Sequence, residues 1–216
     1  FVANPYFREW VPLGKRIGSY LQVLSNSDRP RLFLLCVEDI WHTAPQSLPT
    51  GFEQGLEIIE YASLAELKKY LSPREGGTAY LDENNSLGVA LECWNPKSVT
   101  AQIDYQRRGK TAYEQDCARQ ANRLAAPAHR AAYEAFMAGA SELEIAAAYL
   151  RGCDCSENEM PYGIIAGVNE HAAVLHHHNL DKQRPTPRSF LIDAGVAMNG
   201  YASDITRTYA YDSGSD

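Results

Sequence analysis

Short apolar runs alternate with polar breaks in the first half of the chain. Between Tyr20 and Val37, two apolar stretches flank the polar group Ser25–Asp28, a pattern typical of a β-hairpin. Further strands are predicted over Leu56–Tyr61 and Thr78–Leu81, and a short helix over Leu64–Leu71, with Ser63 and Glu66 in the positions of a capping box. This mixture of strands and helices predicts an α/β or α+β domain.

The pattern changes to a helical period in the second half. Residues Tyr113–Met137 are rich in alanine, with apolar residues spaced for one buried face: Cys117, Ala121, Leu124, Ala128, Ala132 and Phe136. Pro127 inside this run predicts a kink or a division into two helices. Ser141 and Glu144 form a second capping box, which predicts a helix from there to Leu150. A polar, basic stretch over Ile103–Lys110 separates the two patterns and predicts two domains, residues 1–108 and 109–216.

Charge and cysteine content exclude several classes of protein. A net charge of −7 argues against binding to nucleic acid or to an anionic membrane. Apolar runs are all well short of the ~20 residues that cross a bilayer. Five cysteines in unrelated contexts do not indicate a disulfide framework, which favours the cytoplasm. Cys153 and Cys155 lack the second pair that a structural zinc site needs.

Two aspartates near the end of the chain are the strongest chemical signal. Asp193 ends an apolar run that predicts a buried strand, and Gly195 is placed to allow a sharp turn after it. Asp204 begins a second strand-like stretch. Two such strands would direct both carboxylates into one pocket, where a divalent ion such as manganese or magnesium would offset their repulsion. Spacing alone leaves a second interpretation open, in which Asp193 caps a strand and Asp204 pairs with Arg207.

Several motifs resemble one enzyme family. Residues Asp193–Gly195 and Asp204–Thr208 resemble the first two ligand positions of the pita-bread metallopeptidases. Residues Pro161–His176, which include NEHAAVLH, are similar to the substrate-side motif of the bacterial Xaa-Pro dipeptidases, or prolidases, whose near relatives include organophosphorus acid anhydrolases. Residues Phe1–Trp10 and Ile40–His42 resemble the N-terminal domain of the same enzymes. The resemblance implies a creatinase-like N-terminal domain followed by the first part of a pita-bread catalytic domain.

The resemblance also implies a mechanism. Two divalent ions would share a water molecule and convert it to the attacking hydroxide. We expect manganese, because an oxygen-rich site favours hard metal ions. Asp193 would bind one ion through both oxygens and Asp204 would bridge the two. His176 would stabilise the tetrahedral intermediate, and Tyr162 would line the site. Family members carry their other three ligands, one histidine and two glutamates, downstream, so we expect the chain ending at Asp216 to be a fragment of a longer enzyme.

Two candidate site residues have a structural interpretation as well. Tyr162 is equally consistent with a packed core tyrosine, and Trp41 with a residue buried in its own domain. The resemblance places Trp41 against the catalytic domain, in some relatives that of a dimer partner, and implies a homodimer. Strand alternation puts His176 and His178 on one face and His177 on the other, and His177 and His178 are expected to be exposed.

The expected substrates are Xaa-Pro dipeptides. Three alternatives remain: hydrolysis of organophosphorus triesters at the same site, a broader aminopeptidase P or creatinase-type activity, and a homologue without metal that binds a peptide or partner.

Overall fold

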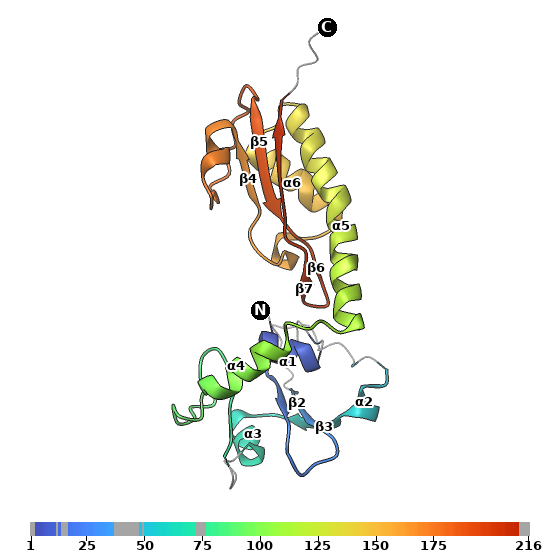
Figure 1. The fold of residues 1–216 in the computed structure, drawn as a ribbon, viewed down its shortest axis with the longest axis vertical. Coiled ribbons are helices and arrows are strands. Elements are labelled where there is room, and N and C mark those ends of the chain that lie inside the picture. The colour runs from blue at the N-terminus through green and yellow to red at the C-terminus, as the bar shows by residue number, and fades with distance from the viewer. Residues whose placement is uncertain are drawn as a thin grey trace. The chain divides into compact units, whose positions relative to one another are not determined.

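The computed structural model describes residues 3–11, 13, 17–36, 48, 50–71 and 77–211. The chain divides into two compact units, Phe1–Gly109 and Lys110–Asp216 (Figure 1). Every helix in the described part of the chain is too short or too polar to cross a membrane.

The first unit contains a small mixed sheet. Its elements are α1 (Pro5–Trp10), β1 (Ser19–Gln22), β2 (Arg31–Leu35), α2 (Phe52–Gly55), β3 (Glu57–Tyr61), α3 (Leu64–Tyr70) and α4 (Lys97–Gln106). Strand β2 pairs antiparallel with β1 and parallel with β3. The predicted hairpin, the following strand and the helix that begins after Ser63 are therefore confirmed.

Strand β2 is the centre of this unit because both of its faces are buried. Side chains alternate along a strand, so Leu32 and Leu34 pack with Val11 on one side. Phe33 packs on the other side with Tyr61, Leu67 and Leu87.

The prediction of a strand over Thr78–Leu81 is wrong. This segment forms only an isolated bridge between Tyr80 and Trp94. The Asp82 carboxylate accepts hydrogen bonds from the backbone N–H groups of Asn84 and Ser86, at 2.7 and 2.8 Å. These bonds turn the chain immediately after Tyr80, so no strand can extend there.

The second unit packs two helices against one face of an antiparallel sheet (Figure 1). Its elements are α5 (Ala112–Met137), α6 (Glu142–Cys153), η1 (Glu157–Glu159), β4 (Ile165–Val168), η2 (Asn169–Ala173), β5 (Ser189–Ala194), β6 (Ala197–Met198), β7 (Tyr201–Ala202) and β8 (Ile205–Ala210). The sheet order is β4-β5-β8, and the β6-β7 hairpin forms the connection between β5 and β8.

Alternation along β5 separates the core from the site. Phe190, Ile192 and Ala194 are buried against the helices, and Phe136 of α5 stacks on Phe190 with ring centroids 5.1 Å apart. Small residues allow α5 and α6 to pack closely, since a Cβ on Gly152 would lie 2.6 Å from the Cα of Ala128. The residues between, including Asp193, therefore point to the other face of the sheet.

Both helices of this unit begin at a capping box, with Thr111 and Glu114 in α5 and Ser141 and Glu144 in α6. The course of each helix differs from the prediction. The capping box of Ser141 and Glu144 is confirmed, and α6 continues to Cys153 rather than Leu150. Helix α5 is continuous through Pro127, so the proline does not divide it. Leu124 is 38% exposed and Ala125 is buried in its place, because only a small side chain fits where the helix faces its neighbour.

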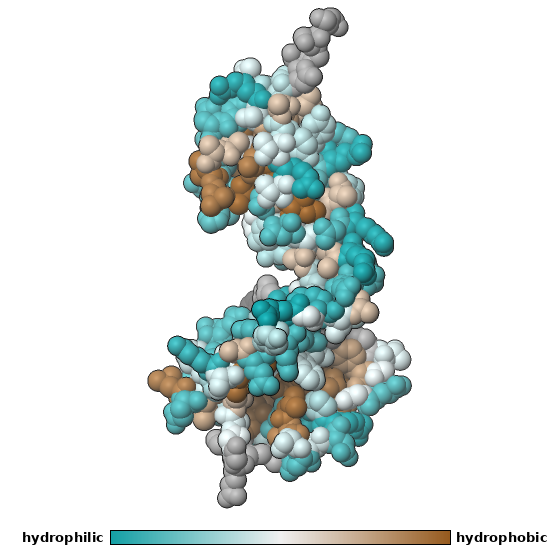
Figure 2. All heavy atoms as spheres, viewed as in Figure 1, coloured by the Kyte–Doolittle hydropathy of each residue, from teal (hydrophilic) through white to brown (hydrophobic). Residues whose placement is uncertain are grey.

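Apolar side chains also remain on the surface of both units, as Figure 2 shows for one face. In the second unit the large exposed apolar residues include Leu143, Val174 and Leu175.

Candidate active site

Asp193 and Asp204 lie on the same face of the sheet. Asp193 of β5 is paired in register with Thr206 of β8, whose hydroxyl donates to Asp193 Oδ2 at 2.7 Å. Asp204 precedes Thr206 by two residues, so strand alternation returns its side chain to that face. The two carboxylates thus occupy a diagonal cross-strand position, and Asp193 is half-buried whereas Asp204 is exposed.

The Tyr162 hydroxyl joins the two carboxylates. It donates to Asp204 Oδ1 at 2.9 Å and also interacts with the Asp193 carboxylate. Burial, together with these two negative charges, raises the pKa of Tyr162 far above its ordinary value. The phenol therefore remains protonated at all physiological pH values and acts as a hydrogen-bond donor.

Arginine does not neutralise this pair. Within the described residues, neither Asp193 nor Asp204 forms an ion pair, and Arg207 donates instead to the backbone carbonyl of Thr206 at 2.8 Å. The interpretation in which Arg207 pairs with Asp204 has no support in the structure. Two partly hydrated carboxylates without a cation suit a hard divalent ion, whose preferred ligands are carboxylate oxygens.

Gly195 has a different role from the predicted turn. Its backbone lies outside the left-handed region, so no turn requires glycine there. A Cβ at this position would lie 2.0 Å from the carbonyl oxygen of Ser203. Val196 N–H donates to Ser203 Oγ at 2.9 Å, and Ser203 N–H donates to Val196 O at 2.9 Å. Glycine therefore allows the segment after Asp193 to contact the segment before Asp204.

His129 supports the strand that carries Asp193 from the helix side. It is buried, and its Nε2 donates to the Ala194 carbonyl at 3.2 Å. Burial lowers the pKa of His129, which favours the neutral ring. The sequence pattern gave this histidine no special role, because its partner is 65 residues away.

The histidines after η2 do not form the predicted strand end. A turn at residues 175 and 176 follows η2, and His176 and His178 are exposed with ring centroids 6.3 Å apart. His178 lies near Gly163, which follows Tyr162. The predicted exposure of His178 is confirmed, but that of His177 is wrong: His177 is only 9% exposed, because its ring binds a buried carboxylate.

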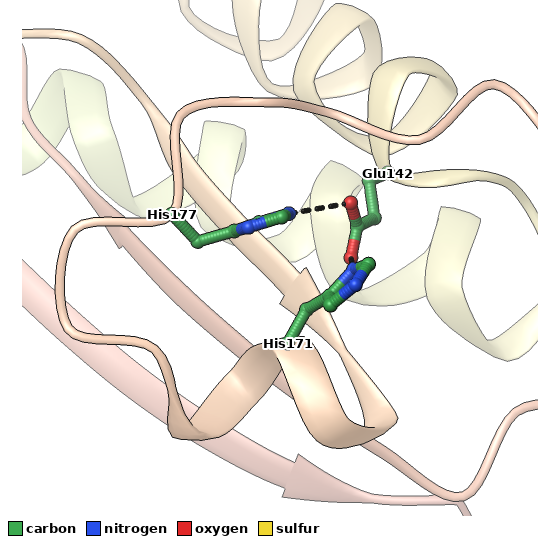
Figure 3. A group of neighbouring side chains, drawn as sticks. All are labelled: Glu142, His171 and His177. Carbon is green, nitrogen blue, oxygen red and sulfur yellow. Dashed lines mark hydrogen bonds and ion pairs between the residues drawn. The ribbon is translucent and has the colours of Figure 1, made fainter.

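That carboxylate belongs to Glu142, the first residue of α6, and Figure 3 shows it between His171 and His177. It accepts four hydrogen bonds. Oε1 accepts from the Val168 N–H and from His171 Nδ1, both at 2.9 Å. Oε2 accepts from the Asp181 N–H at 2.9 Å and from His177 Nε2 at 2.7 Å. The two imidazole rings stack with centroids 4.4 Å apart.

These bonds shift the pKa values of Glu142 and His171. Burial raises the pKa of Glu142, but its four hydrogen bonds together outweigh burial and hold the pKa below its ordinary value. The hydrogen bond to Glu142 raises the pKa of His171. Glu142, His171 and His177 are of the residue types that bind transition metals, and their ligand atoms lie within 4.8 Å of one another. All lone-pair positions of the carboxylate are already used by N–H donors, which favours a hydrogen-bonded cluster.

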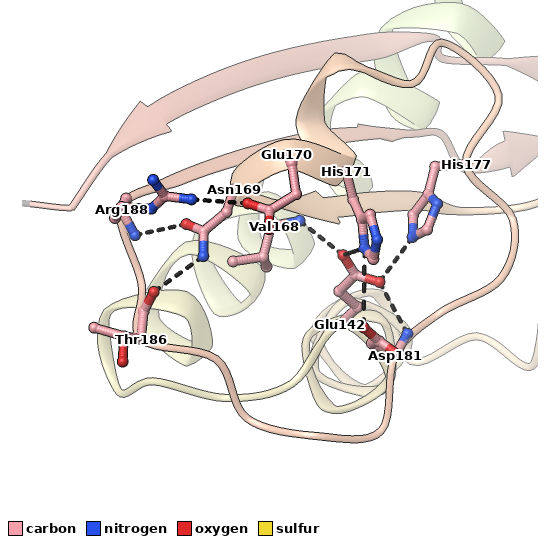
Figure 4. A network of polar contacts seen from close by, with 9 residues as sticks. All are labelled: Glu142, Val168, Asn169, Glu170, His171, His177, Asp181, Thr186 and Arg188. Carbon is pink, nitrogen blue, oxygen red and sulfur yellow. Dashed lines mark hydrogen bonds and ion pairs between the residues drawn. The ribbon is translucent and has the colours of Figure 1, made fainter.

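A second set of polar contacts adjoins this cluster (Figure 4). The Asn169 side chain accepts from the Arg188 N–H at 2.8 Å and donates to the Thr186 carbonyl at 3.0 Å. Arg188 also pairs with Glu170 at 2.8 Å. The motif at 169–171 therefore ties η2 to the chain that enters β5.

Trp41, which is predicted with Tyr162 to bind the substrate, lies outside the described residues, as do Asp39, Ile40 and His42. The prediction for Trp41 stays a prediction.

Comparison with known proteins defines the class to which this fold and site belong. Residues 116–216 match metallopeptidase family M24, and residues 1–105 match the N-terminal domain of Xaa-Pro dipeptidases. The two matches together span nearly the whole chain, and each lies within one of its two units. The predicted fold, an N-terminal domain of this type followed by part of a pita-bread catalytic domain, is confirmed.

The relatives with curated names are Xaa-Pro dipeptidases. The chain is 38% identical to that of Serratia proteamaculans over 100% of its own length and 50% of the relative's length. It is 39% identical to that of Pseudoalteromonas haloplanktis, over 98% of this chain and 48% of the relative. The chain thus spans about half the length of the curated relatives it matches.

Solved structures share the fold. The prolidase from Pyrococcus furiosus has a TM-score of 0.62 at 21% identity, covering 98% of this chain and 60% of that one. The Xaa-Pro dipeptidase from Bacillus anthracis has a TM-score of 0.61 at 18% identity, covering 100% of this chain and 61% of that one.

Proposed function

We propose that this chain is part of a metal-dependent dipeptidase that hydrolyses Xaa-Pro dipeptides. In this proposal, residues 1–108 are the N-terminal domain and residues 109–216 are the first part of the catalytic domain. The names of the curated relatives, at 38% to 39% identity along nearly the whole chain, support the substrate class.

One observation carries the proposal: two carboxylates share a face of the sheet and a tyrosine hydroxyl, and neither has a cationic partner among the residues that the structure describes. Asp193 and Asp204 would hold the divalent ions, and their oxygen donors favour manganese. When bound, such ions lower the pKa of water and polarise a carbonyl group. Asp193 lies within the paired part of β5 and Asp204 directly precedes β8, so both ligands are attached to paired backbone before an ion arrives.

The chain's other residues have roles that follow from their chemistry. Tyr162 stays protonated and orients the Asp204 carboxylate by donating to it. His176 is exposed, so it is free to donate to the substrate oxygen on which negative charge develops. Trp41 would supply a flat apolar surface for the proline ring.

Hydrolysis assays on the whole gene product test this function. We expect manganese-dependent cleavage of Ala-Pro, with a kcat/KM well above that for a fluorophosphonate. The opposite ratio would make the protein an organophosphorus triester hydrolase. Absence of both activities in a folded protein supplied with manganese would contradict the proposal. Cleavage of longer Xaa-Pro peptides would then indicate an aminopeptidase P-type enzyme, and failure to bind manganese would indicate the homologue without metal that binds a peptide or partner.

Assembly and compartment complete the proposal. We propose a homodimer in the cytoplasm. All five cysteines are free thiols, which agrees with a reducing compartment. Light scattering of the whole gene product at micromolar concentration measures the mass directly, and a monomeric mass would contradict the dimer.

A further inference from the structure

The segment that carries His176 is held at both ends by one side chain. His171 lies five residues before His176 and His177 lies one residue after it, and both imidazoles donate to Glu142 (Figure 3). Glu142 itself is 1% exposed and fixed at the start of α6, whose capping box positions the first turn.

Burial of apolar side chains contributes little to holding this segment. Val174 and Leu175, between the two anchored histidines, are 48% and 82% exposed. The Val174 N–H donates to the His171 carbonyl at 3.0 Å, so the turn depends on where His171 is held. Polar contacts must therefore fix the direction in which His176 points.

We propose that Glu142 is a positioning residue for His176, and that it acts by anchoring His171 and His177 on its two carboxylate oxygens. This inference rests on the proposed function of His176. His177 supplies the second anchor through its Nε2–H.

The carboxylate is required in its ionised form. A glutamine at position 142 would present one oxygen and one NH2 group to four N–H donors. The backbone N–H that then faces the NH2 group would lose its acceptor, and the imidazole beside it would have to change tautomer to keep a hydrogen bond. The four donors come from β4, η2 and the turn at 177–181, so the loss would release several segments at once.

The test uses Glu142→Gln in the whole gene product, with Glu144→Gln as the matched control. Glu144 lies in the same helical turn and binds Arg184 through both oxygens, at 2.7 and 2.9 Å, but does not contact either histidine. We expect Glu142→Gln to speed amide hydrogen exchange at Val168 and Asp181, whose N–H groups donate to Glu142, and at Val174, whose N–H donates to the His171 carbonyl, by at least 10-fold. We also expect it to lower kcat for Ala-Pro about 10- to 100-fold with little change in KM. Glu144→Gln should leave both close to wild type.

A second pair of variants separates anchoring from folding. The amide nitrogen of glutamine can replace the histidine Nε2 as a donor, so His177→Gln should retain the wild-type exchange rates and kcat. His177→Phe fills the same space without a donor, and it should reproduce the effects of Glu142→Gln.

Three results would overturn the inference. The first is wild-type exchange at Val168, Val174 and Asp181 in Glu142→Gln, and the second is equal kcat in His177→Phe and His177→Gln. The third is stoichiometric zinc binding that Glu142→Gln abolishes, because the cluster would then be a metal site. If the wild-type protein does not cleave Ala-Pro, the proposed function fails, and the exchange rates alone decide whether Glu142 anchors the turn.

Discussion

Gly195→Ala is the substitution whose effect the structure defines most sharply. The added Cβ would lie 2.0 Å from the Ser203 carbonyl oxygen, whereas real Cβ contacts are essentially never shorter than 3.0 Å. The Ser203 backbone would have to retreat by at least the difference between these distances. Both groups belong to buried backbone, so no flexible side chain can move aside.

This displacement has both an energetic and a functional consequence. Overpacking of a buried position costs about 1–3 kcal/mol, and a backbone–backbone clash belongs at the upper end of that range or above it. The retreat would also break the paired hydrogen bonds between Val196 and Ser203, which lies next to Asp204. We therefore expect a loss of about 3 kcal/mol or more in the free energy of unfolding of the second unit. We also expect manganese affinity to fall.

Urea unfolding monitored by circular dichroism measures this change, with Gly163→Ala as the control. A Cβ on Gly163 would lie 3.6 Å from the nearest atom of His178, an ordinary contact, and this residue is exposed. Gly163→Ala should therefore shift stability by no more than about 0.5 kcal/mol. Equal stability of the Gly195→Ala variant and the wild type would refute the close-approach argument.

Three further predictions concern the core, the histidine cluster and the N-terminal domain. Phe136→Ala should lower the free energy of unfolding by about 3–5 kcal/mol in denaturant titrations, because the ring is fully buried against Phe190, and a loss below 1 kcal/mol would contradict that packing. The raised pKa of His171 means that its contribution to stability is present below about pH 6.5 and is lost as the pH rises through its folded-state pKa. His171→Ala should thus destabilise more at about pH 5.5 than at about pH 8.5, and the reverse order would be inconsistent with the Glu142 bond. Trp41→Ala in the whole gene product should raise KM for Xaa-Pro dipeptides with little change in melting temperature, whereas a large fall in melting temperature at constant KM would make Trp41 a core residue.

The features that could be predicted from the sequence depend on residues close together in the chain. The start of α6 follows from Ser141 and Glu144, three residues apart, whose two hydrogen bonds form within one turn. Alternation along β5 likewise indicates that Asp193 points away from Phe190 and Ile192. The prediction that Asp193 and Asp204 share a site rests on the same kind of signal. Each aspartate lies next to a short strand pattern that can be read from its immediate neighbours in the chain.

Other features depend on contacts that no local pattern records. The burial of His177 results from Glu142, which lies 35 residues earlier. The exposure of Leu124 depends on how α5 faces its neighbours, and a helical period alone leaves a rotation of one residue open. The need for glycine at position 195 could not be predicted either, because it comes from the close approach of Ser203, on the other side of the β6-β7 hairpin.

Metal dependence of Ala-Pro hydrolysis, compared between the wild type and Asp204→Asn, tests the central claim most directly. The whole gene product is treated with a chelator, and manganese is then added back while hydrolysis is followed. We predict that manganese restores activity to the wild type but not to Asp204→Asn, because a neutral amide cannot balance the charge of two divalent ions. Full restoration of the Asp204→Asn variant would contradict the assignment of Asp193 and Asp204 as the metal-binding pair.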